Sequence, residues 1–142
     1  METIALGPFA VTPDGAIAPR AADPAPALRF AWRGRACRAE LAADGLRLSA
    51  DAARIPSTAE PGADRRRAFA AVARLPARLP RGWRARLLPD HRLRLEASAP
   101  LAAPANATAL VASLVRFVLA LDPYLDSLEE AGVASPGGSS RT

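Results

Sequence analysis

The 142-residue chain contains no lysine and no glutamine, and it has one cysteine, one histidine and one methionine. All 19 basic residues are therefore arginine, which indicates the codon bias of a GC-rich, bacterial genome. Without lysine, catalysis through a lysine Schiff base is excluded, and a single cysteine excludes an intramolecular disulfide. Only 5% of the residues are aromatic. We therefore expect a core built mainly from leucine, valine and alanine.

The residues that most often carry catalysis or bind metals are sparse. Cys37 lies on the apolar phase of a predicted strand, where a small buried hydrophobe is the expected role. His91 lies in a predicted turn without a second histidine or cysteine nearby, so we expect no metal site. No glycine-rich phosphate loop and no serine-hydrolase elbow is present. We predict solubilising surface charge for four acidic residues near the C-terminal end: Asp122, Asp126, Glu129 and Glu130.

These absences predict a protein without catalytic residues, cofactor or enzymatic activity; a small enzyme of unknown chemistry is the second alternative. The N-terminus lacks a charged and then apolar leader, so we expect no signal peptide and a cytoplasmic location. The most apolar stretch, residues 110–121, is shorter than the roughly 20 residues of a membrane span and carries Arg116, so we predict no membrane partner. We expect one α+β domain over residues 1–134 and a disordered Gly/Ser tail over 135–142.

The stretch around which the rest is organised runs from Gly82 to Glu130. Alternating apolar residues predict a hairpin, Trp83–Leu88 and His91–Ala97, turned at Pro89-Asp90. Leucines at steps of three and four then predict a helix from Asn106 to Glu130, with Asn106 or Thr108 as N-cap and Gly132 as its end. Pro123 lies inside this pattern, so we expect a kink or break near Asp122 and a short second helix.

The first half predicts further strands and a short helix. A hairpin is expected at Phe9–Val11 and Ala16–Ala18, followed by a three-stranded meander at 28–32, 36–41 and 46–51. Asp64 is a candidate cap for a helix reaching Leu75, with Phe69, Val72 and Ala73 facing inward. The order predicts an α+β fold: an antiparallel sheet with two helices packed on one face, the C-terminal one being long.

Arginines recur on the polar phase of the predicted strands. Residues 29–94 hold 16 arginines against six acidic residues, although the net charge of the whole chain is +5. If the strands share one sheet, seven arginines form a single face: Arg29, Arg38, Arg47, Arg84, Arg86, Arg92 and Arg94. We predict that another protein binds this face. A nucleic-acid-binding surface is the first alternative, but the aromatic residues lie on the opposite phase, away from any bound bases. A merely solvated face, with arginines set by codon bias, also remains open.

The predicted C-terminal helix is apolar around more of its circumference than the stripe of about 100° that packing on one sheet requires. Its second apolar rail consists of Val111, Val115 and Val118. We therefore predict a homodimer with these valines at the interface.

Some of these patterns resemble class I type III secretion chaperones and the related YbjN-like proteins. Arg92-Leu93-Arg94-Leu95-Glu96 leads through Ala99-Pro100-Leu101 into the helix Leu110–Leu128, similar to their closing strand, corner and final helix. The Cys37–Leu48 meander followed by a helix is similar to their first half. The resemblance covers residues 28–130. It implies a small homodimeric α+β protein that holds an extended segment of another protein on its sheet and helix surface, and it carries over no catalytic residue.

Overall fold

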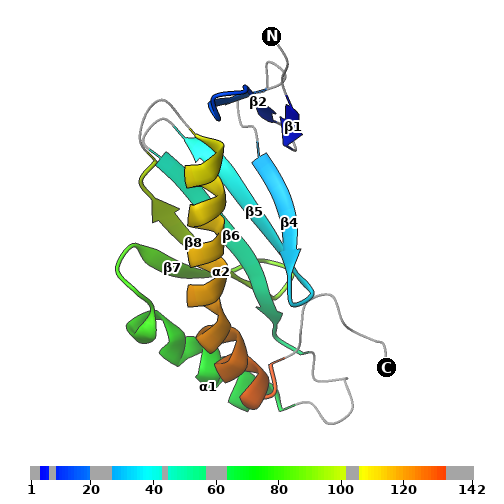
Figure 1. Cartoon of the computed structure of the whole chain (residues 1–142). Coiled ribbons are helices and arrows are strands. Elements are labelled where there is room, and N and C mark those ends of the chain that lie inside the picture. Colours follow the sequence, from blue (N-terminus) through cyan, green and yellow to red (C-terminus); the bar gives the residue numbers. More distant parts are fainter. Residues whose placement is uncertain are drawn as a thin grey trace.

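The computed structural model describes residues 4–6, 9–19, 27–42, 45–56, 64–101 and 106–133. This part of the chain is α+β, with eight strands in two antiparallel sheets and two α-helices (Figure 1). The predicted fold class is confirmed at this level. The prediction of a single sheet is wrong, because the first hairpin belongs to a small sheet of its own. The expected tail, residues 135–142, lies outside the described residues.

The small sheet covers the beginning of the long helix. It consists of β1 (Ile4–Leu6), β2 (Phe9–Val11) and β3 (Ile17–Pro19). Phe9 is fully buried, and the N–H of Ala107 donates to the C=O of Gly15 at 2.6 Å. The predicted turn between β2 and β3 therefore also supplies a backbone acceptor for the first helical residue.

The large sheet has the strand order β4-β5-β6-β8-β7. Its β4–β5 turn is Arg33-Gly34, and both residues have positive φ (51° and 77°), as a two-residue hairpin turn with the native twist requires. Gly45 begins β6 at φ 146°, where a Cβ atom would lie 2.4 Å from the C=O of Ala99. The five strands are β4 (Ala27–Trp32), β5 (Arg35–Ala42), β6 (Gly45–Arg54), β7 (Trp83–Leu87) and β8 (Arg92–Ala99).

The long helix α2 (Ala107–Glu130) crosses one face of this sheet (Figure 1). The Asn106 side chain accepts hydrogen bonds from the N–H groups of the next turn, as predicted, and Gly132 follows the helix end at φ 80°. The predicted break near Asp122 is wrong, because α2 continues through Pro123. Pro123 and Leu119, whose carbonyl the proline deprives of a donor, are both exposed. The lost bond therefore faces the solvent side, where water can replace it.

The shorter helix α1 (Arg65–Arg74) continues into a 3₁₀ turn, η1 (Leu75–Arg78). Asp64 caps α1 as predicted, accepting from the N–H of Arg67 at 3.0 Å. The predicted inward face is confirmed for Val72, which packs against the core, and wrong for Phe69, which is 38% exposed, and for Ala73, which is exposed; Ala68 is the buried residue of this helix. Because α1 is short and buries little surface, its apolar residues do not form a regular pattern that would predict which side faces the core.

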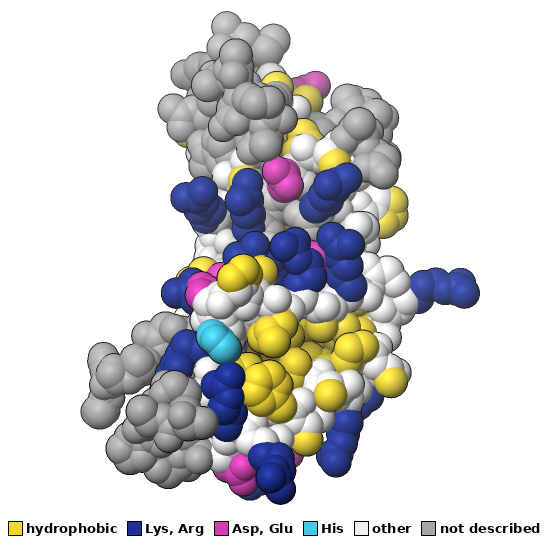
Figure 2. Space-filling view, turned by 180° about the vertical axis from the view of Figure 1, so that it is seen from behind, with side chains coloured by type: hydrophobic (Ala, Val, Ile, Leu, Met, Phe, Trp, Pro, Cys, Tyr) yellow, Lys and Arg dark blue, Asp and Glu magenta, His cyan; other side chains and the backbone are white. Residues whose placement is uncertain are grey.

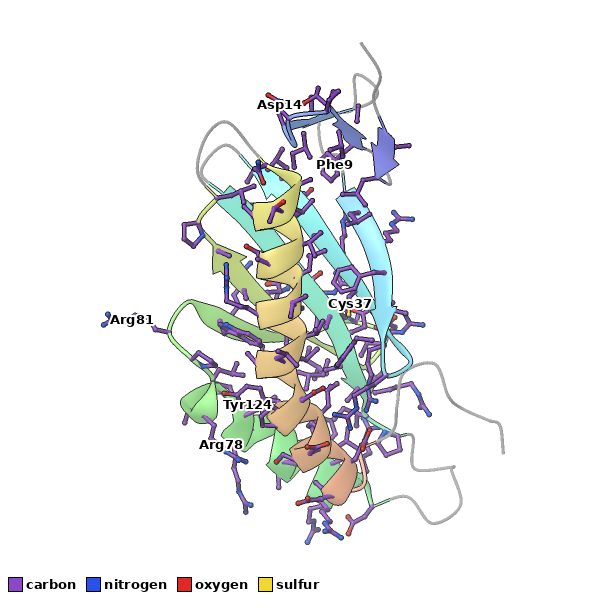
Figure 3. The ribbon with its side chains drawn as sticks, viewed as in Figure 1. Phe9, Asp14, Cys37, Arg78, Arg81 and Tyr124 are labelled. Atoms are coloured by element: carbon purple, nitrogen blue, oxygen red, sulfur yellow. The ribbon has the colours of Figure 1, made fainter. Side chains whose placement is uncertain are left out.

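The core fills the layer between α2 and the large sheet. The inward residues of the central strands are buried, as the alternation predicts, and they meet the leucines of α2. Trp83 packs against Phe117 and Tyr124, with ring centroids 5.1 and 5.9 Å apart. The Tyr124 hydroxyl donates to the C=O of Arg78, which ties η1 to α2 (Figure 3).

Candidate functional site: the arginine face

The register places all seven predicted arginines on the face of the large sheet opposite α2. Arg29 pairs with Arg38, which pairs with Ser49, and the same row continues through Glu96 to Arg84. The other four lie two or four residues away along their strands, so their side chains share that face. Figure 2 shows this band of arginine across the molecule. We call this surface the arginine face.

An eighth arginine, Arg54, joins the arginine face. Its position follows from a register shift between Asp51 and Ala53, after which Arg54 pairs with Arg92. The sequence analysis missed it, because strict alternation was followed only as far as residue 51 and a bulge changes the phase beyond it. Two adjacent apolar residues, Ala52 and Ala53, interrupt the alternation and are the signal that could have revealed the bulge.

Like charges stand directly opposite one another on this face. Three cross-strand pairs are arginine against arginine: Arg29 with Arg38, Arg54 with Arg92, and Arg86 with Arg94. Like charges directly opposite one another destabilise a sheet unless a carboxylate lies between them. Three other cross-strand pairs place an arginine opposite a carboxylate: Arg47 with Glu40, Arg94 with Asp51, and Arg84 with Glu96.

Two carboxylates hold four of these arginines. Asp51, whose side chain is only 11% exposed, accepts from Arg94 Nε at 2.7 Å and lies 3.7 Å from Arg92 Nη1. The hydrogen bond to Asp51 raises the pKa of Arg94 above its ordinary value. Glu96 receives both arginines of β7, with Nε of Arg84 at 2.5 Å and Nη1 of Arg86 at 3.1 Å. Each of these carboxylates is shared between two guanidinium groups, and Arg92 also pairs with Asp90, whose Oδ2 lies 3.4 Å from Arg92 Nε.

Other arginines of the face have little or no compensation. Arg38 lies 3.6 Å from Glu40. Arg29 and Arg47 are exposed, and neither forms an ion pair with any residue in the described part of the chain. The face has a hollow of about 670 Å³, and five arginines take part in its lining: Arg38, Arg47, Arg84, Arg86 and Arg94. The hollow therefore presents several guanidinium groups with free donors to solvent.

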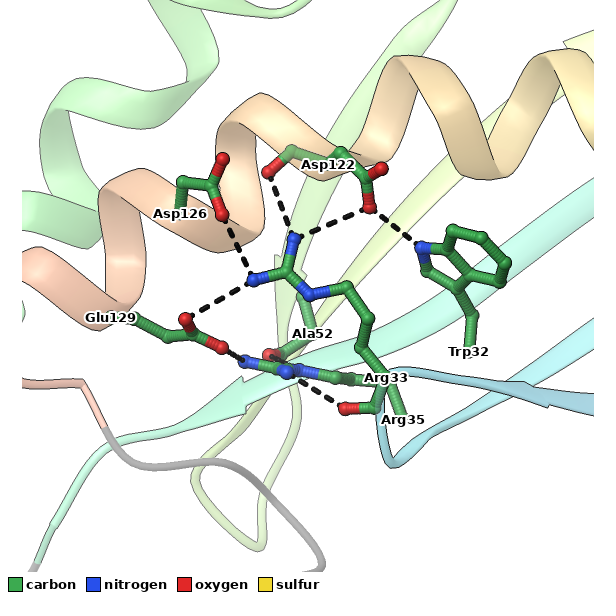
Figure 4. A network of polar contacts seen from close by, with 7 residues as sticks. All are labelled: Trp32, Arg33, Arg35, Ala52, Asp122, Asp126 and Glu129. Atoms are coloured by element: carbon green, nitrogen blue, oxygen red, sulfur yellow. Dashed lines mark hydrogen bonds and ion pairs between the residues drawn. The ribbon is translucent and has the colours of Figure 1, made fainter.

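A second group of arginines holds the molecule together. Arg33, in the β4–β5 turn, reaches Asp122 at 3.2 Å, Asp126 at 2.9 Å and Glu129 at 3.1 Å (Figure 4). Asp122 also accepts from the indole N–H of Trp32 at 2.7 Å. These bonds raise the pKa of Arg33, with the hydrogen bond to Asp126 as the largest cause.

Arg35 completes this network from inside the protein. It is only 3% exposed, and its guanidinium donates to the C=O of Ala52 at 3.1 Å and of Arg33 at 2.8 Å. Its Nη2 lies 2.9 Å from Glu129 Oε2, an ion pair whose angles fall outside hydrogen-bond geometry. The prediction of solubilising charge is therefore wrong for Asp122, Asp126 and Glu129, which fasten α2 to the β4–β5 turn.

The structure separates the three valines of the predicted dimer interface. Val111 and Val115 are each 48% exposed and, with Leu119 at 58%, form an outward stripe on α2. Val118 is 7% exposed and belongs to the core, so it is not available to a second chain. With a mean hydropathy of 1.5, α2 is long and apolar enough to cross a membrane. Core helices of soluble proteins can be equally long and apolar.

The single cysteine and the single histidine lie in different settings. Cys37 is buried on β5 beside α2 (Figure 3), and burial raises its pKa to about 11, with a smaller contribution from Asp51. Its thiol is therefore protonated at neutral pH. His91 is exposed at the tip of the β7–β8 hairpin, with φ 69°. Within the described residues, no group of three His, Cys, Asp or Glu side chains is placed to hold a metal ion.

Fold and surface together define a small α+β protein that presents an arginine-covered open sheet. The chain matches no protein-family model, and no curated protein or solved structure is significantly similar to it. The resemblance to secretion chaperones and YbjN-like proteins therefore stays a prediction from the sequence.

Proposed function

We propose that this protein is a non-enzymatic binding module that holds an extended acidic segment of another protein on the arginine face. The observation that carries the proposal is the surplus of arginine at the β4–β5 side of the face, where Arg29 stands directly opposite Arg38 and Glu40 is the one carboxylate that the described residues place there. A sheet selected for stability alone gains by placing opposite charges there. An acidic ligand removes the repulsion, and it receives bidentate, charge-assisted hydrogen bonds from guanidinium groups.

An acidic polypeptide fits this face better than a single-stranded nucleic acid does. Sequence-tolerant binding of single strands uses aromatic rings on which bases stack. The aromatic residues of the large sheet, Phe30, Trp32 and Trp83, all lie on the helix side and pack on the core. The open face offers charge without stacking platforms.

The test measures binding of a short fluorescein-labelled peptide of alternating Glu and Ser by fluorescence anisotropy. We expect the double variant Arg29→Gln/Arg47→Gln to weaken binding at least about tenfold, since two charge-assisted bonds together exceed 1.4 kcal/mol. The matched control, Arg74→Gln/Arg81→Gln, changes the net charge equally at exposed positions outside the arginine face. It should change the affinity less than about twofold.

Two results would overturn the proposal. Equal losses in both double variants would show that only net charge matters. Tighter binding of an oligonucleotide than of the peptide at physiological salt, with a steep dependence of affinity on salt concentration, would identify a nucleic-acid-binding protein instead.

We also infer that a second copy of the chain covers the stripe formed by Val111, Val115 and Leu119. The stripe lies on one exposed side of a helix, where two copies can pack antiparallel with the same residues on both sides. Light scattering should then give the mass of a dimer, and Val115→Asp should give that of a monomer. A single-chain mass for the unmodified protein, or partition of the protein into lipid vesicles, would contradict this inference.

A further inference from the structure

Strand β7 lies at an edge of the large sheet and has β8 on one side only. The N–H of Leu88, next to β7, donates to the C=O of Arg92 at 2.8 Å. Hydrogen-bonded and non-bonded pairs alternate along an antiparallel ladder, so the two arginines of β7 direct their backbone groups toward β8. Ala85 and Leu87 direct theirs away from the sheet. No residue in the described part of the chain bonds to these outward groups.

The two sides of this edge differ in chemistry. Toward the arginine face stand Arg84 and Arg86, with side chains 71% and 52% exposed. Toward the helix side stands Leu87, which is 48% exposed, whereas its cross-strand neighbour Leu93 is 1% exposed. The apolar layer of the sheet is thus complete at β8 and incomplete at β7.

Helix α1 borders the same region. It lies on the side of β7 away from β8 (Figure 1), and its Phe69 is 38% exposed. Figure 2 shows a hydrophobic area of surface beside the single histidine, His91, and below the band of arginine. A free strand edge therefore lies between a basic surface and an apolar one.

We propose that β7 takes up a sixth strand antiparallel to it, supplied by a partner protein as an extended segment in which acidic and apolar residues alternate. This inference rests on the proposed function and names the chemistry of the partner. Acidic side chains of the added strand face Arg84 and Arg86, and the apolar ones extend the core layer at Leu87. The same strand of a second copy fits less well, because the registers that place Ala85 opposite Ala85 or Leu87 would also place arginines opposite arginines.

The first experiment uses a fluorescein-labelled peptide that alternates Glu and Val. In a strand added antiparallel to β7, the residues opposite Ala85 and Leu87 share their side of the sheet, so the valine amides point at β7 and the glutamate amides point away. N-methylation of the valine amides should weaken binding at least about tenfold, because it removes two or more hydrogen bonds and adds a steric clash. N-methylation of the glutamate amides should change it less than about twofold.

A pair of variants tests whether the peptide binds at the β7 edge of the sheet. Ala85→Pro removes an outward N–H from β7 and leaves the hydrogen bonds between β7 and β8 in place. This variant should weaken binding of the Glu/Val peptide at least about tenfold. The control, Ala31→Pro, makes the same change at the opposite edge, in β4, where Ala31 also points its N–H outward beside the two-residue turn. Hydrogen exchange on the unmodified protein checks the assignment independently of any variant: the amides of Ala85 and Leu87 should gain protection when the peptide binds.

The outcomes distinguish this inference from the proposed function. Equal binding of both methylated peptides, combined with sensitivity to Arg29→Gln/Arg47→Gln, overturns strand addition and leaves acidic binding on the arginine face. Binding of the Glu/Ser peptide without binding of the Glu/Val peptide does the same. Failure of both peptides overturns both proposals.

Discussion

Glu129 and Asp126 lie one turn apart on α2 and contact the same cluster of arginines, yet their contributions to stability should differ severalfold. Glu129 bonds to Arg33 and also to Arg35, which is 3% exposed. Asp126, with a side chain 60% exposed, bonds to Arg33 alone. Removing the partner of a buried charge lowers stability more than removing the partner of a solvated charge.

The magnitudes follow from this difference in burial. Removing the partner of a fully buried charge costs about 3–5 kcal/mol. Glu129 is itself 47% exposed, and two backbone carbonyls still hold Arg35, so we expect Glu129→Gln to cost about 1–2 kcal/mol. Asp126→Asn should cost at most about 0.5 kcal/mol, the range of exposed pairs.

Urea unfolding followed by circular dichroism measures both values, and salt separates them. At high salt the Asp126→Asn effect should vanish, whereas most of the Glu129→Gln effect should persist, because buried pairs are screened less. In a protein that already carries Arg35→Met, Glu129→Gln should lower the free energy of unfolding by no more than Asp126→Asn does. Equal costs for the two single variants, or a Glu129 effect unchanged in that background, would refute the reasoning.

Three further outcomes follow from the backbone and the core. His91→Gly should raise stability by about 0.5–1 kcal/mol in thermal unfolding, because φ 69° is strained for a residue with a Cβ atom but not for glycine. Gly45→Ala should cost more than about 2 kcal/mol, since its Cβ meets the C=O of Ala99 at 2.4 Å, whereas Gly82→Ala, with φ 89° and open space, should cost about 1 kcal/mol. Cys37 should alkylate slowly at neutral pH, and because its folded pKa of about 11 exceeds that of an unfolded thiol, stability should fall as pH rises from about 9 to 11.

The strands of the large sheet could be predicted because short stretches of sequence are enough to identify each strand and turn. Alternation with period two marks each central strand, and turn residues such as Arg33-Gly34 limit the possible registers. The side of each strand on which the arginines lie follows from these two facts, whereas their union in one face depends on the pairing of β6 with β8. That β6 pairs with β8, and that β7 becomes an edge, is a long-range choice that no local pattern carries.

The errors arose where a residue's partner is distant in sequence. Asp122, Asp126 and Glu129 looked like solvent charge, because the arginines that bind them lie about ninety residues earlier. Pro123 looked like a helix break because its propensity was judged without the packing on both sides of it, where Leu121 and Leu125 are fully buried. Tertiary contacts worth several kcal/mol override a local preference of about 3 kcal/mol.

Codon bias explains why the positive charges are arginines, but it does not explain where they stand. Arg33 and Arg35 occupy positions where three carboxylates meet them, and such an arrangement stabilises the fold. Arg29 stands opposite Arg38, although a serine or threonine would fit that exposed strand position without repulsion. Drift in base composition changes lysine to arginine wherever a positive charge is already tolerated. The proposal of an acidic ligand therefore rests on the placement of Arg29 and Arg47, which form no ion pair with the described residues, and not on the choice of arginine over lysine.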